Sequence, residues 1–137
     1  MCLDSLRRFK SIDVGYRVLH RDFEDAHYYP LCYYDRDKSL LIGVWLDESD
    51  YRPENCQEAK GIYLKPNTTY PFGWHTFQTL KGAREWRGDG FCVSIVKVAI
   101  KDIVATGIQD AGDNNYHVVV SKKIKILEEV KDGDTRS

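Results

Sequence analysis

The clearest structural signal in the chain is the run Val118-Val119-Val120-Ser121-Lys122-Lys123-Ile124-Lys125-Ile126-Leu127. Its second half alternates apolar with charged side chains, which predicts that the two isoleucines face inward and that Lys123 and Lys125 face outward, as in a half-buried strand. β-branched residues dominate the run and favour extended backbone. We therefore expect residues 118–127 to form the strand that completes a sheet.

Two further strands are predicted immediately before this run. Within residues 91–100, β-branched side chains alternate with lysine and alanine, and residues 103–108 form a shorter apolar stretch. Residues 110–115 are rich in Asp, Asn and Gly, which favours a turn. The chain becomes polar after residue 130, so we expect one globular domain over residues 1–130 and a disordered tail over residues 131–137.

The centre of the chain predicts one helix among short strands. Thr79 can cap a helix over residues 80–87, whose apolar side chains recur at three-residue steps, and Gly88 can end it. The other predicted strands cover residues 14–21, 40–46, 61–64 and 73–77. Residues 2–12 carry apolar side chains three apart, which suits a short amphipathic helix or an ordered arm. The expected fold class is α+β, with a single small mixed or antiparallel sheet and one or two short helices.

Charge and hydropathy exclude several classes of protein. The 137 residues include 20 Lys and Arg against 21 Asp and Glu, for a formal net charge of −1. Such a balance provides no positive field that would attract nucleic acid indiscriminately. No apolar run is long enough to cross a bilayer, and the amino terminus lacks the apolar centre of a signal peptide. We expect a cytoplasmic protein that has no membrane partner.

The cysteines predict neither a metal site nor a redox dithiol. They contain no Cys-x-x-Cys pair and are expected to be reduced thiols, with Cys92 in the core. Removal of Met1 would make Cys2 an amino-terminal nucleophile. Proteins of that kind carry a glycine after the cysteine, whereas Leu3 follows Cys2 here. The four positions are Cys2, Cys32, Cys56 and Cys92. No cofactor is predicted.

Aromatic and basic side chains gather in the first third of the chain and again around residue 75. Nucleobases stack on aromatic rings and phosphates accept charge-assisted bonds from arginine, so this mixture favours a nucleotide-like ligand. The candidate ligand-binding residues are Arg17, His20, Tyr28, Tyr29, Trp74, His75 and Arg84. The alternative is structural, with the tyrosines packed at a sheet edge or in a homo-oligomer contact and His75 hydrogen-bonded in the core.

An acidic, turn-rich segment over residues 47–57 supplies a second candidate surface. Its carboxylates could imitate a nucleic-acid backbone and occupy a basic groove of a partner protein, or they could be ordinary solvated surface. The candidate partner-binding residues are Asp47, Glu48, Asp50 and Glu54. The same segment is also the best candidate for a mobile loop.

Short motifs in the chain resemble those of a loose group of small phage and bacterial proteins. They are, in order, Gly15-Tyr16-Arg17-Val18-Leu19, Gly73-Trp74-His75-Thr76-Phe77, Ala83, Val96-Lys97-Val98 and the closing run of residues 119–127. The resemblance implies a small mixed sheet with one or two helices and a phage or prophage origin. Some phage proteins of this kind counter host defence, by sequestering a nucleotide signal or by occupying a surface of a defence protein.

Binding is expected in preference to catalysis, because no carboxylate or nucleophile stands in a recognisable catalytic frame. The leading hypothesis is a phage-type protein, in the cytoplasm of a bacterial host, that binds a nucleotide-like small molecule. One alternative is an anti-CRISPR-like inhibitor that docks on a host defence protein. The other is an ADP-ribosyltransferase-like enzyme, in which Tyr16, Arg17 and His20 would hold a dinucleotide and Glu85 or Glu128 would activate the acceptor.

Overall fold

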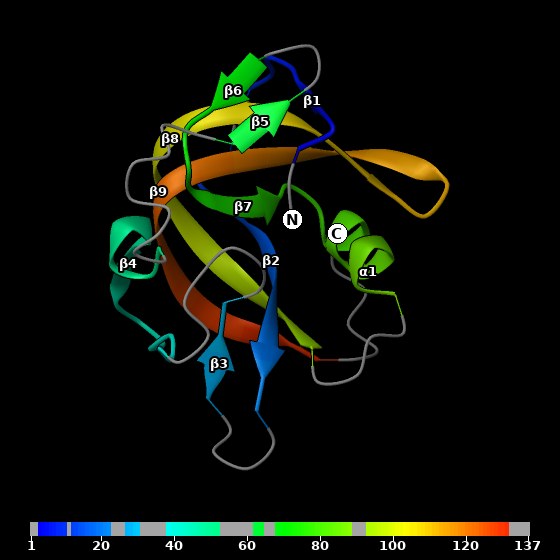
Figure 1. Cartoon of the computed structure of the whole chain (residues 1–137). Coiled ribbons are helices and arrows are strands. Elements are labelled where there is room, and N and C mark those ends of the chain that lie inside the picture. Colours follow the sequence, from blue (N-terminus) through cyan, green and yellow to red (C-terminus); the bar gives the residue numbers. More distant parts are fainter. Residues whose placement is uncertain are drawn as a thin grey trace.

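The structure, a computed structural model, describes residues 3–10, 12–22, 27–30, 38–52, 62–64, 68–88 and 93–131. Its elements (Figure 1) are β1 (Ser5–Leu6), β2 (Val14–Arg21), β3 (Tyr28–Tyr29), β4 (Trp45–Asp47), η1 (Glu48–Asp50), β5 (Ile62–Leu64), β6 (Thr68–Tyr70), β7 (Trp74–Phe77), α1 (Leu80–Arg87), β8 (Val93–Ala111) and β9 (Asn114–Val130). The predicted tail, the four cysteines and residues 53–57 lie outside the described residues, apart from Lys131 at the start of the tail.

The expected α+β class is wrong, because the described chain is mostly β and α1 is its one α-helix. Of the two forms expected for residues 2–12, the described residues 3–10 take the ordered arm and not the helix, and Ser5 and Leu6 pair with Ile108 and Gly107 of β8. The Asp4 and Arg7 amides donate to carbonyls at the edge of β8, and Leu3 is buried in the core, so tertiary pairing overrides the three-residue spacing.

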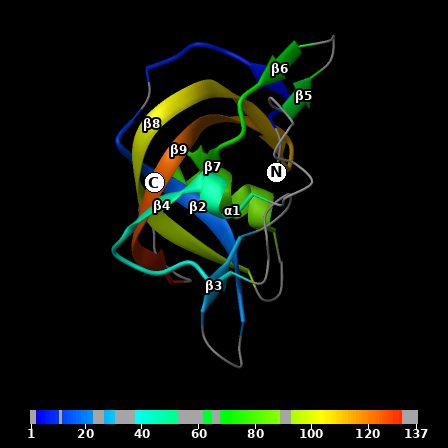
Figure 2. The same ribbon diagram turned by 60° about the vertical axis from the view of Figure 1, so that its left-hand side comes forward.

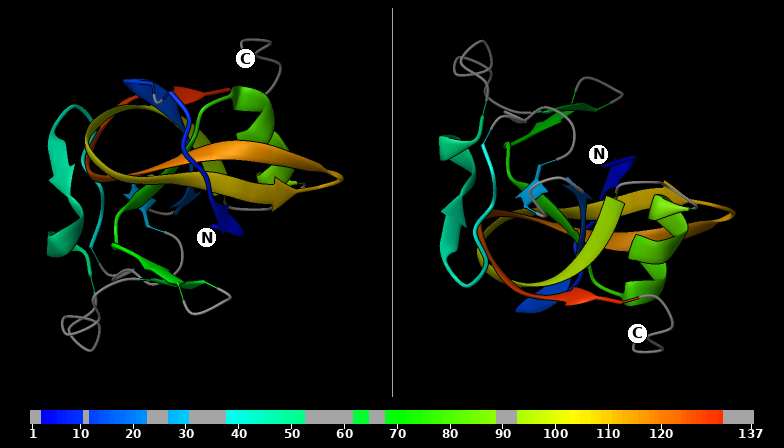
Figure 3. Two further views of the ribbon diagram at one scale, coloured as in Figure 1. Left: turned by 90° about the horizontal axis from the view of Figure 1, so that it is seen from above. Right: turned by 90° about the horizontal axis from the view of Figure 1, so that it is seen from below.

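The long hairpin of β8 and β9 organises the sheet. β8 pairs with β9 and with β2, β9 pairs with β7, and Tyr16 of β2 stands opposite Phe77 of β7, so these four antiparallel pairings close a ring. Seen from above, β8 and β9 are strongly curved and form much of this ring (Figure 3). β1 extends the sheet from β8, β3 from β2 and β4 from β9, and β5 and β6 form a separate two-stranded sheet.

The two strands predicted over residues 91–100 and 103–108 are one strand of 19 residues, β8. The register with β9 shifts between Lys97 and Val98 and again between Ile103 and Ala105, and Asp102 has a positive φ of 60°. A bulge of this kind bends a strand and increases its twist. The interruption in the apolar pattern near residue 102 therefore marks a bend and not a strand end.

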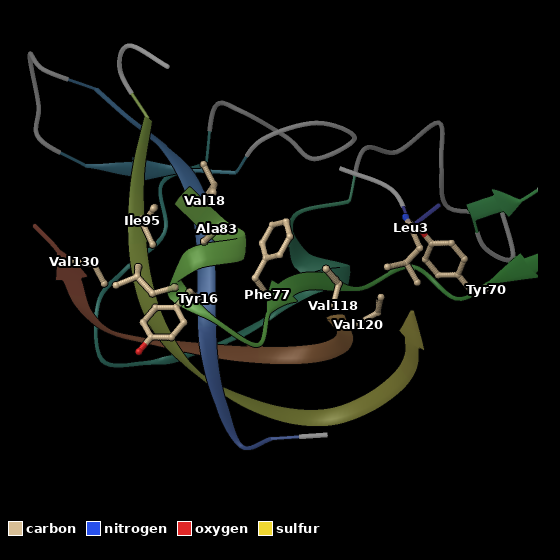
Figure 4. Packing of buried hydrophobic residues seen from close by; sticks show 11 residues of the cluster. Leu3, Tyr16, Val18, Tyr70, Phe77, Ala83, Ile95, Val118, Val120 and Val130 are labelled. Atoms are coloured by element: carbon tan, nitrogen blue, oxygen red, sulfur yellow. Dashed lines mark hydrogen bonds between the residues drawn. The ribbon is translucent and has the colours of Figure 1, made fainter. Parts of the chain in front are cut away.

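Side chains on both faces of the sheet are buried. Val118 and Val120 belong to one apolar cluster, which Leu80 and Ala83 of α1 help to form (Figure 4), whereas Val119 belongs to a second cluster around Trp74. α1 packs against β2, β7, β8 and β9 (Figure 2). The three consecutive valines are thus explained, since a strand covered on both faces needs no polar alternation.

Two local predictions are confirmed to the residue. β2 covers Val14–Arg21, and α1 covers Leu80–Arg87 with the Thr79 side chain accepting a hydrogen bond from the Gly82 amide at 3.1 Å. The strand expected over residues 40–46 is shorter than predicted, because Leu40 and Ile42 make only isolated bridges before β4 begins.

Candidate functional site

A buried polar cluster lies where β2 and β7 meet. Arg17 is 2% exposed and His75 is 3% exposed, so neither side chain faces solvent. The Arg17 Nη1 donates to the His75 carbonyl at 2.5 Å, and its guanidinium carbon lies 4.9 Å from the centroid of the Trp74 ring. The indole Nε1 of Trp74 donates to the Leu46 carbonyl at 3.0 Å. These three predicted ligand residues therefore do lie together, but their contacts are with one another and with the backbone inside the core.

The protonation of His75 follows from its partners. Burial, reinforced by the nearby Arg17 cation, lowers the pKa of His75 to about 3, so the imidazole is neutral at physiological pH. Nδ1 lies 3.2 Å from the Gly73 carbonyl, which can only accept, so Nδ1 carries the proton. Nε2 then accepts from the Tyr70 hydroxyl at 2.9 Å, and that hydroxyl accepts from the Leu3 amide at 2.8 Å. This chain of bonds ties the amino-terminal arm to the core.

The acidic segment does not present its carboxylates together. Glu48 is fully buried, and its carboxylate is paired with Arg52 and with Lys122, whose Nζ lies 3.1 Å away. Asp47 caps η1 by accepting from the Ser49 amide at 3.1 Å, and these bonds help to hold the pKa of its carboxyl below the usual value against the opposing effect of burial. Asp50 is exposed, and Glu54 lies outside the described residues. Glu48 is thus a structural ion-pair residue.

The remaining predicted ligand residues lie apart from the buried cluster. His20 and Tyr29 face each other at the β2–β3 end with ring centroids 6.4 Å apart. Tyr28 is buried there beneath Arg21, which forms an ion pair with Glu129 at 2.8 Å. Arg84 lies on α1, on another part of the fold. The seven residues singled out from the sequence therefore do not converge on one site.

A pocket of about 520 Å³ opens instead between the amino-terminal arm, the end of β6 and the bulged part of β8. Its volume falls within the range of ordinary small-molecule sites. Two arginines, Arg7 and Arg8, provide the charge, and the apolar walls come from Leu6 of the arm, from Tyr70 and Pro71, and from residues 103–105 of β8. The residues that line it are Leu6, Arg7, Arg8, Thr69, Tyr70, Pro71, Ile103, Val104, Ala105 and Thr106.

Hydrogen bonds to β8 and β6 hold the arm in place over this pocket. The Arg7 amide donates to the Thr106 carbonyl at 3.0 Å, and the Thr106 hydroxyl donates to the Arg7 carbonyl at 2.6 Å. Leu3 packs beside Tyr70 (Figure 4), whose ring forms part of the pocket wall. Gly107 makes this docking possible, because a Cβ there would lie 2.7 Å from the Leu3 side chain.

Neither a metal-binding cluster nor a helix that could span a membrane is found in the described ranges. No group of three or more His, Cys, Asp or Glu side chains there could hold a metal ion. None of the helices in that part of the chain has the length and apolar character needed to span a membrane.

Comparison with protein-family models, with curated proteins and with solved structures finds no match to this chain.

Proposed function

We propose that this chain is a binding protein whose ligand is a small anionic molecule with an apolar body, and that nucleotides are the class to test first. The observation that carries the proposal is the pocket beneath the arm, where Arg7 and Arg8 stand beside aliphatic walls formed by residues such as Leu6 and Ile103. Arginine forms paired, charge-assisted bonds with phosphate, and apolar walls can cover a ring or chain.

We place the proposed binding site in this pocket and not at the residues expected from the sequence. Arg17, Trp74 and His75 are engaged with one another in the interior, so a ligand would have to break buried bonds to reach them. A ligand can reach the pocket beside the arm without breaking such bonds, because the pocket is open and Arg7 and Arg8 are exposed. A role in countering bacterial defence would follow if the ligand proved to be a defence-signalling nucleotide.

Thermal unfolding with a panel of linear and cyclic mono- and dinucleotides tests this function. A ligand at a hundredfold excess over its dissociation constant should add about 2.7 kcal/mol to the free energy of unfolding and raise the Tm. The double variant Arg7→Ala/Arg8→Ala should lose the shift. Lys10→Ala is the matched control, because Lys10 is an exposed cation of the same arm that does not line the pocket. If no nucleotide raises the Tm, or the control loses the shift equally, the proposal is wrong.

A further inference from the structure

Exposed apolar side chains occur beside β4 that do not line the pocket. Of the seven large apolar side chains that are exposed in the described part of the chain, two, Leu6 and Ile103, line the pocket. The other five belong to β4, to the segment just before it and to the neighbouring strand β9. They are Leu41 (59% exposed), Ile42 (57%), Val44 (43%), Trp45 (42%) and Leu127 (42%). Monomeric proteins seldom leave such a group uncovered without a use for it.

The strand pairings place Ile42 and Trp45 beside β9 near Leu127, and Leu41 and Val44 are their neighbours in the chain. Trp45 stands opposite Lys125 of β9, and Ile42 bridges to Ile126, the neighbour of Leu127. In Figure 2, β4 lies in front of the curled sheet, on the side turned toward the viewer, and it ends the strand order of that sheet. We call this group, with the lysines described next, the β4 surface.

Lysines surround the tryptophan of the β4 surface. The Lys125 Nζ lies 4.8 Å and the Lys101 Nζ lies 5.6 Å from the centroid of the Trp45 ring. Lys123 stands opposite Lys101 in the β8–β9 pairing. Carboxylates lie nearby as well: that of Asp102 is 3.8 Å from the Lys123 Nζ, that of Asp47 accepts bonds from Ser49, and the exposed Glu128 follows Leu127 in the chain. The part of the edge next to Trp45 is therefore positively charged.

We propose that the β4 surface docks on a partner protein whose contact face has an apolar centre bordered by Asp or Glu side chains. An apolar centre with Trp inside a charged rim is the usual composition of a protein interface, and opposite charge on the partner is required to compensate the lysines. This surface is distinct from the pocket, and the proposal does not depend on the ligand proposed above.

The geometry favours an acidic protein over a second copy of this chain and over a lipid bilayer as the occupant of the β4 surface. In a two-fold contact between copies of this chain, each copy would bring its lysines against those of the other, which costs free energy. In a bilayer, apolar groups penetrate ahead of the cations, but here the ammonium groups lie over the Trp45 ring itself. A partner that covers Trp45 therefore also covers these ammonium groups, so it must supply carboxylates that pair with them.

Reversing two charges of the β4 surface tests the proposal. The variant Lys101→Glu/Lys125→Glu is compared with Lys10→Glu/Lys81→Glu, which makes the same change in net charge at exposed positions elsewhere. Lysate of the cells that naturally express the chain is passed over wild type and both variants. The proteins retained by wild type and by the control, but not by the β4 variant, are identified, purified and titrated directly.

The expected result is a purified acidic partner whose dissociation constant rises about thirtyfold or more with Trp45→Ala and with the β4 charge reversal, and rises with salt. Circular dichroism and the Tm of each variant check that the fold is retained. The proposal is overturned if no protein is retained selectively, or if the purified protein binds the β4 variant as tightly as wild type. It is equally overturned if ultracentrifugation of the chain alone, or sedimentation with phosphatidylcholine:phosphatidylglycerol vesicles (3:1), shows self-association or lipid binding that the β4 reversal abolishes.

Discussion

Acidification should destabilise the protein through His75. The folded-state pKa of about 3 lies below the ordinary value of 6.5, because burial and the Arg17 cation disfavour the imidazolium. Below pH 6.5 the unfolded chain takes up a proton at this residue that the folded chain refuses, so the free energy of unfolding falls as the pH falls toward 3. At pH 4.5, two units below the unfolded pKa, the loss from this residue is about 2.7 kcal/mol relative to neutral pH.

The variant His75→Gln isolates this contribution. Glutamine keeps a donor and an acceptor near Gly73 and Tyr70 but cannot take up a proton. Wild type should therefore have the larger free energy of unfolding at pH 7.5, and the difference between the two proteins should shrink by about 2.7 kcal/mol at pH 4.5. Urea unfolding of both proteins, followed by circular dichroism across this range, measures the difference, and the other histidines cancel because both proteins contain them. A difference that stays constant with pH, or an NMR titration that places the pKa of His75 near 6.5, would refute the reasoning.

Three further predictions concern the same framework. Tyr70→Phe removes the hydroxyl that joins Leu3 to His75, and should lower the free energy of unfolding by about 2 kcal/mol and speed proteolysis of the arm, both measurable on the purified protein. Glu48→Gln leaves two cations facing a neutral side chain and should cost about 3 kcal/mol in urea unfolding; a cost below about 1 kcal/mol would show that the ion pairs are unimportant. Asp102→Gly should change stability by no more than about 1 kcal/mol, whereas Asp102→Val should lower the Tm clearly, since only the second worsens a positive φ.

Local signals in the sequence predicted the elements whose determinants are themselves local. The Thr79 cap and the glycine at position 88 define α1 from within ten residues of chain, and the bounds of β2 were also predicted from its own residues, although its centre is buried on both faces and not half-buried as expected. The fold class could not be obtained in this way. Asp102 interrupts the apolar pattern as a turn would, and only the pairing with β9 shows that the strand continues through it.

The residues of the pocket were also beyond local prediction. Arg7 and Arg8 stand out in the sequence as a basic pair, but a basic pair is most often solvated surface. They become a candidate site only because the arm pairs with β8, a contact between positions about 100 residues apart. Conversely, Arg17, Trp74 and His75 have the composition of a ligand site, and their burial, which no short motif reveals, makes them a structural cluster.

Tyr70 connects the buried cluster to the pocket. Its ring lines the pocket wall, while its hydroxyl holds the Leu3 amide on one side and the neutral His75 on the other. The polar groups placed in the interior at some cost in desolvation therefore fix the position of the arm, and the arm carries both arginines of the candidate site. Since a buried hydrogen-bonded network has few alternative arrangements, the pocket is held open in advance of any ligand, which reduces the entropy that binding must overcome.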